Sequence, residues 1–161
     1  MNIEKYISAL LVLLIRSEVC WVRAFGFRLS ACKRVFTTEV QTQAVDGVTW
    51  FINPEWTLAN SKFKNLFVMV HEAKHLFSRH PERLRDCLPQ QAELVHKAAD
   101  YAVNLGLEQA GCPWQMPDDG LINRDFVDDD GKALNVERIL ALLMQENSEQ
   151  EKGQDLSLIH I

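Results

Sequence analysis

The sequence predicts an α+β fold that is mostly helical, with a small β-hairpin beside one central helix. Apolar residues recur at i, i+3, i+4 and i+7 over residues 66–77, and residues 90–110 form a second strong helical pattern. Between residues 35 and 52, β-branched residues lie on both sides of Asp46-Gly47, a dipeptide typical of tight hairpins. At 161 residues, 47% hydrophobic and 24% charged, the chain is long enough for one domain with a real core.

The N-terminal segment is predicted to be helical and buried. Residues 3–16 form an amphipathic pattern that contains the apolar run 9–15. This run is too short to span a bilayer, and no small-residue cleavage site follows it, so we interpret it as a core helix and not as a signal peptide. Residues 19–29 are ambiguous and could form a second short helix, broken at Gly26.

The middle of the chain predicts a hairpin followed directly by the central helix. We expect strands at residues 35–44 and 48–52. The helix is expected to begin after a cap at Asn60 or Ser61 and to end at about His80, because a proline follows at position 81.

The C-terminal part predicts two more helices and a tail. The helix over residues 90–110 ends at Gly111, and after a loop of solvated turns a last helix covers residues 136–145. Residues 146–161 are polar and glutamate-rich at first, so we expect a disordered tail after a domain at residues 1–145. The last six residues, 156–161, do not continue the polar pattern and look foreign to the domain.

Charge and cysteine usage narrow the function classes. The net charge is −5, which argues against nucleic acid as the main partner. The four cysteines show no C-x-x-C pairing and no export signal accompanies them, so a reducing compartment is favoured. We therefore expect a cytoplasmic protein without a membrane partner.

The central helix carries the pattern H-E-x-x-H as His71-Glu72-Ala73-Lys74-His75. Positions i and i+4 share one helix face, so the two imidazoles can hold one Zn²⁺ from the same side. Glu72 is then the candidate general base for a water that the metal activates. The pattern also occurs by chance, and a solvated helix that happens to carry two histidines is the alternative.

A catalytic zinc ion usually takes three protein ligands, and the third is open on spacing alone. Asp100 and His96 lie on the next long helix, where Asn104 continues the same polar stripe and could orient a ligand. His80 is five residues after His75, roughly 140° round a continued helix, so it points away unless the helix ends early.

Five segments of the chain form a distinctive series. They are the hairpin 44–54, the H-E-x-x-H helix 70–80, the A-A-D-Y-x-x-N motif 98–104, the proline-glycine-leucine stretch 116–122 and the terminal helix 136–143. Together they resemble the metallopeptidase domain that precedes von Willebrand factor A-like domains in bacteria and phages. The resemblance covers roughly residues 5–145 and departs at Lys74, where the family usually has an apolar residue, and at His96, where an asparagine is expected.

The resemblance implies a zincin-like fold with Zn²⁺ held by His71, His75 and Asp100 and with Glu72 as the base. It also implies a von Willebrand factor A-like or AAA+ ATPase partner. The expectation of a peptide or protein substrate comes from the H-E-x-x-H pattern itself, which is typical of amide hydrolysis by a metal-activated water. We therefore predict a zinc-dependent peptidase. The alternatives are a catalytically silent zincin-like module that binds peptides or regulates, and a helical structural protein with a chance motif.

Overall fold

The computed structural model describes residues 1–87 and 89–159, with side chains as far as Gln154, and the chain forms two compact units. The first unit holds Met1–Asp86 and Ala110–Gly120, and the second holds Cys87–Gln109 and the chain from Leu121 onward. Helices predominate around one three-stranded mixed sheet, which confirms the predicted α+β class. The zincin-like assignment and a domain boundary at residue 145 stay predictions.

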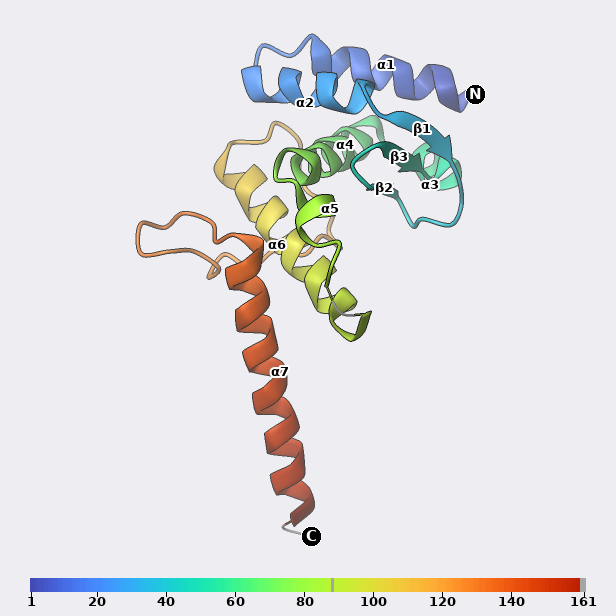
Figure 1. The fold of residues 1–161 in the computed structure, drawn as a ribbon. Helices are drawn as coiled ribbons and strands as arrows, with labels where there is room; N and C mark the ends of the chain where they lie inside the picture. The colour runs from blue at the N-terminus through green and yellow to red at the C-terminus, as the bar shows by residue number, and fades with distance from the viewer. Residues whose placement is uncertain (88, 160–161) are drawn as a thin grey trace. The chain divides into compact units, whose positions relative to one another are not determined.

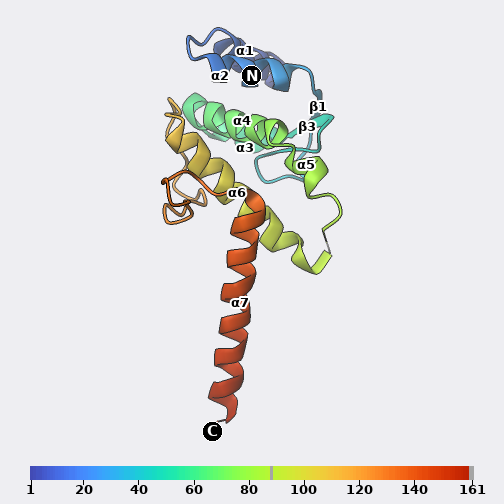
Figure 2. The same cartoon turned by 60° about the vertical axis from the view of Figure 1, so that its left-hand side comes forward.

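Two N-terminal helices form a layer of the first unit. The helices α1 (Ile3–Ile15) and α2 (Cys20–Ser30) lie side by side and pack against α4 (Figures 1 and 2). The side chain of Asn2 caps α1 by accepting a hydrogen bond from the backbone N–H of Lys5. The buried face of α1 is the predicted apolar one and consists of Ile7, Leu10, Leu11 and Leu14.

Gly26 allows α1 and α2 to approach closely and does not break α2. A Cβ atom at this position would lie 2.8 Å from Leu14 Cβ and 3.0 Å from Ile15 Cγ1, closer than real Cβ contacts. The break considered for residues 19–29 is therefore wrong, and the glycine is explained by helix packing.

The sheet contains β1 (Lys33–Phe36), β2 (Gln43–Val45) and β3 (Thr49–Ile52) in the order β1-β3-β2. The antiparallel pair β2–β3 is the predicted hairpin, and β1 adds to β3 in parallel. One continuous strand over residues 35–44 is wrong, because residues between β1 and β2 form a loop around Asn53. The Asn53 side-chain amide donates to the Val40 carbonyl at 2.8 Å and to the Gln41 carbonyl at 3.2 Å.

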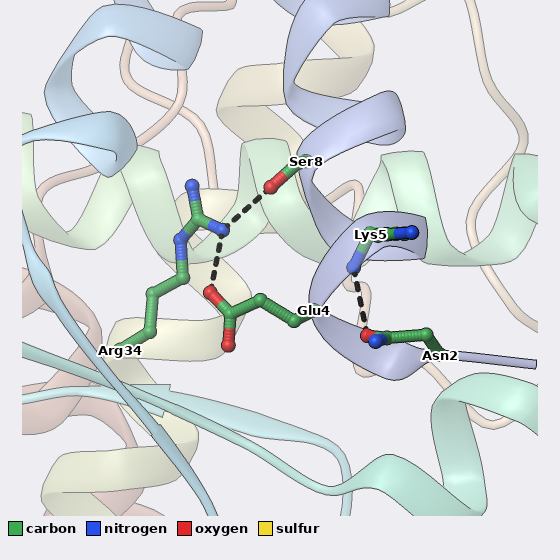
Figure 3. A network of polar contacts seen from close by, with 5 residues as sticks. All are labelled: Asn2, Glu4, Lys5, Ser8 and Arg34. Atoms are coloured by element: carbon green, nitrogen blue, oxygen red, sulfur yellow. Dashed lines mark hydrogen bonds and ion pairs between the residues drawn. The ribbon is translucent and has the colours of Figure 1, made fainter.

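A polar network ties β1 to α1 (Figure 3). Arg34 Nη1 donates to Glu4 Oε1 at 3.2 Å and to Ser8 Oγ at 2.9 Å. The Glu4 side chain is 60% exposed, so the ion pair itself contributes little to stability.

Three helices follow the sheet: α3 (Pro54–Ala59), α4 (Lys62–Phe77) and α5 (His80–Arg83). Ser61 caps α4 as predicted, since its hydroxyl accepts from the Lys64 backbone N–H at 3.2 Å. The predicted end of the central helix at His80 is wrong. The helix stops at Phe77, and His80 opens α5 after a turn.

The second unit is built on two long helices that pack against each other, α6 (Ala92–Gln109), preceded by a short 3₁₀ turn at Pro89–Gln91, and α7 (Val136–Ile159). The helix α7 continues past the predicted end at Gln145, because the sequence there is rich in strong helix formers. Residues 145–154 are exposed, so this extension has no apolar face packed on the unit. No helix within residues 1–87 and 89–159 is long and apolar enough to cross a membrane.

Candidate metal centre

The helix α4 holds the candidate site at the centre of the first unit, where it packs against α1, α2 and β2. Nine of its sixteen residues are buried, so its rotation and its axis are fixed by the surrounding core. Its buried residues include the predicted apolar set except Phe77, and are Asn65, Leu66, Phe67, Val68, Met69, Val70, Glu72, Ala73 and Leu76. Phe77 is 49% exposed because the helix ends there, although its ring stacks on Phe25.

His71 and His75 face each other across one helical turn, as the i, i+4 spacing predicts. Their Nε2 atoms are 2.9 Å apart, and their ring planes are inclined at 73°. Glu72 lies beside them and is only 7% exposed. One ligand atom from each of the three residues lies within 4.8 Å of the others, a grouping that can hold a metal ion.

The spacing of the two imidazoles fits a divalent metal ion bound through Nε2. With Zn–N bonds of about 2.0–2.1 Å, two nitrogens on one ion are about 2.9 Å apart at a right angle and about 3.4 Å apart at the tetrahedral angle. The observed 2.9 Å therefore needs only a small opening of the rings. Imidazole nitrogen and carboxylate oxygen are also a donor set that zinc and related divalent ions accept.

A sharp turn after α4 brings His80 back to the site. Arg79 has a left-handed backbone with φ 57°, the only positive φ at a residue other than glycine in the described chain. His80 is buried at 6% exposure, and its Nδ1 atom lies 3.0 Å from His75 Nδ1. His80 therefore meets His75 at the ring nitrogen opposite the one that faces His71.

The other candidate residues lie on α6, in the second unit. Asp100 is half-buried and His96 is exposed. Asn104 is buried, and its side-chain amide donates to the Leu121 carbonyl at 2.8 Å. The three residues of the predicted polar stripe therefore differ in solvent exposure, from exposed His96 to buried Asn104. The choice of Asp100 as third ligand stays a prediction.

The contact between His75 and His80 was missed by sequence reasoning. A continued helix would carry His80 away from His75, and no glycine marks the left-handed position that redirects the chain. The signal that could have found it is the proline at 81, which is well suited to the first turn of a new helix.

These features define a class: an α+β domain whose core helix carries an H-E-x-x-H cluster able to hold a metal ion. Residues 21–157 match the model of a family described as "Putative metallopeptidase domain". The match spans most of the chain, so the chain belongs to this family. Comparisons with curated proteins and with solved structures found no match.

Proposed function

We propose that this protein is a zinc-dependent peptidase that works at the His71–Glu72–His75 site. One observation carries the proposal: two imidazole Nε2 atoms 2.9 Å apart stand beside a carboxylate that is 7% exposed. Charged side chains are rarely buried this deeply without a functional or paired role. Membership of the metallopeptidase family supports the same reaction class.

Each residue of the site has a distinct task in this proposal. His71 and His75 hold the ion, and Asp100, matched through the family motif, completes the ligand set. A zinc ion bound there would lower the pKa of a coordinated water toward about 7 and would polarise the scissile carbonyl. Glu72 would take a proton from the attacking water as the water oxygen bonds to the carbonyl carbon. It would then deliver that proton to the amine nitrogen as the C–N bond breaks.

An extended peptide is the substrate that the surroundings of α4 favour. The strand β2 is at an edge of the sheet and packs against α4, the helix that carries the two histidines. Edge strands can add an extended peptide by backbone hydrogen bonds, which places the peptide along the helix. This geometry supports endopeptidase chemistry on an unfolded segment.

Replacement of the proposed base tests the proposal. Zinc-loaded wild-type protein, Glu72→Gln and Glu93→Gln are incubated with a mixed peptide library, and new termini are counted by mass spectrometry. Glu93 is an exposed glutamate on α6, so its substitution controls for the chemical change itself. We expect Glu72→Gln to lose about 10²–10⁴-fold in cleavage rate, with zinc content unchanged, and Glu93→Gln to match the wild type.

Two outcomes would contradict the peptidase assignment. A Glu72→Gln variant as active as the wild type would remove Glu72 from the reaction. A zinc-loaded wild type that retains peptides without cutting any of them would instead identify the silent binding module.

A further inference from the structure

We propose that His80 is a positioning residue that fixes the tautomer and orientation of His75, so that His75 Nε2 is presented to the metal. This inference rests on the proposed function, since it assumes that His71 and His75 share an ion. It is carried by a separate observation, the 3.0 Å contact between His75 Nδ1 and His80 Nδ1.

The contacts of His75 with His71 and His80 determine which ring nitrogen donates the hydrogen bond between His75 and His80. His75 Nε2 faces His71 Nε2, so an ion shared by the two residues binds at these atoms. A neutral imidazole that uses Nε2 for a metal carries its proton on Nδ1. His75 Nδ1–H must then donate, and His80 Nδ1 must accept, which leaves the His80 proton on Nε2.

Hydrogen bonding of this kind holds a ligand ring in place and makes the metal-binding nitrogen more basic. The usual acceptors are a carboxylate or a backbone carbonyl, and here the acceptor is a second imidazole. The two rings are inclined at 67° with centroids 5.2 Å apart, so they meet edge-on and do not stack face to face. In this arrangement the closest polar contact between the two rings joins His75 Nδ1 to His80 Nδ1.

The backbone around His80 is built to hold the ring there. The Ser78 carbonyl accepts from Arg83 Nη1 at 2.9 Å, and the backbone N–H of Arg83 donates to the Arg79 carbonyl at 2.9 Å. A left-handed arginine is an unfavourable backbone state, which persists only when its surroundings determine it. Here the result of that state is the return of His80, buried, to His75.

The test compares three substitutions at one position. His80→Phe keeps a ring without an acceptor, His80→Asn places an amide oxygen near the Nδ1 position, and His80→Gln places it one bond further out. Zinc affinity is measured by competition with a chromophoric chelator. Far-UV circular dichroism of each metal-free variant verifies that it is folded.

We expect the affinity for zinc to fall about tenfold to a hundredfold in His80→Phe and in His80→Gln. His80→Asn should recover most of the wild-type affinity, because the acceptor is back in position. A purely structural role would not distinguish Asn from Gln. Equal affinity in all variants, or equal loss in His80→Asn and His80→Phe, would overturn the inference.

Two further measurements separate the remaining readings. Long-range ¹H–¹⁵N correlation spectra of the zinc-loaded wild type should show His75 protonated on Nδ1 and His80 protonated on Nε2; the opposite pattern would contradict the proposal. With Co²⁺ in place of zinc, the absorption bands of His80→Asn should equal those of the wild type. A changed spectrum would make His80 a ligand.

A wild type that binds no metal would overturn the proposed function as well, whereas tight wild-type binding with unaffected variants would overturn this inference alone.

Discussion

Asp100 is the residue on which the composition of the proposed metal centre depends most. His71 and His75 supply two nitrogens, and a catalytic zinc ion usually takes a third protein ligand. We expect Asp100→Ala to lose its zinc during gel filtration, as His75→Ala does, while the wild type keeps about one ion per chain. Elemental analysis of the purified proteins measures this directly.

Asp125→Ala is the matched control for that experiment, because Asp125 is an exposed aspartate of the same unit. It should retain zinc at the wild-type level. Zinc retained by Asp100→Ala would exclude Asp100 as a required ligand and would return His96 and His80 to consideration.

At the scale of single residues, the sequence predicted the part of the site that is local in the chain. His71, Glu72 and His75 come together because one helical turn separates the two histidines, and no tertiary contact is needed for that. The position of His80 could not be predicted in the same way. It depends on a left-handed turn at Arg79, where neither glycine nor asparagine is present.

The packing of α1 against α2 depends on the absence of a side chain at Gly26. In an exposed helix, Gly→Ala is stabilising by roughly 0.5–1 kcal/mol. At Gly26 the added Cβ would lie 2.8 Å from Leu14 Cβ and 3.0 Å from the Ile15 backbone nitrogen. We expect Gly26→Ala to lower the free energy of unfolding by about 1–3 kcal/mol, as other overpacked cores do.

Urea unfolding followed by circular dichroism measures that change. The control is Gly153→Ala in α7, where nothing lies within 4 Å of the added Cβ. The control should leave the midpoint unchanged or raise it. An equal response of the two variants would show that the α1–α2 contact is looser than described.

The hairpin turn is held by one carboxylate. Asp46 Oδ1 accepts from the backbone N–H groups of Thr49 at 2.7 Å and Val48 at 2.9 Å, and these bonds hold the pKa of Asp46 below its ordinary value. A lowered pKa contributes stability above the pKa of the unfolded chain, and that stability is lost as the pH falls through the folded value. We therefore expect the stability difference between wild type and Asp46→Ala to be constant at neutral pH and to shrink below about pH 4.

The expected difference at neutral pH is about 0.5–1 kcal/mol, because the carboxylate is exposed and the bonds are screened by water. Thermal unfolding at several pH values measures it. Asp46→Asn keeps an acceptor oxygen without the charge, so it should be less destabilised than Asp46→Ala and should lose the dependence on acidic pH.

At the scale of elements, the sequence predicted helices and the hairpin better than it predicted their limits. Amphipathic periodicity located α1, α4 and α6, and the turn at Asp46-Gly47 located β2–β3. The parallel partner β1 was missed because pairing between Lys33 and Thr49 is not encoded in either segment alone. The early end of α4 at Phe77 was missed because no glycine marks the left-handed turn at Arg79 that follows it.

For the molecule as a whole, metal removal should lower thermal stability. A ligand that binds only the folded state stabilises it by about 2.7 kcal/mol at a concentration one hundred times its Kd. We expect zinc to raise the unfolding temperature of the wild type and an excess of chelator to reverse the shift. His75→Ala keeps all four cysteines, so it controls for zinc bound by thiols.

The His75→Ala protein should unfold at the same temperature with zinc and with chelator. Differential scanning fluorimetry is sufficient for this comparison. A zinc-dependent shift of equal size in His75→Ala would place the stabilising ion elsewhere in the chain.

The strand order β1-β3-β2 has a consequence for the time course of folding. The central strand β3 is the last of the three to leave the ribosome, so β1 has no partner while the next dozen or so residues are synthesised. Hairpins close in about 1–10 μs once both strands are available, so β2 and β3 pair first and offer β1 a ready edge. Until β3 has been synthesised, the row of free amide groups along β1 is open to pairing with other nascent chains, and the rate of synthesis, not the closure of the hairpin, sets that interval.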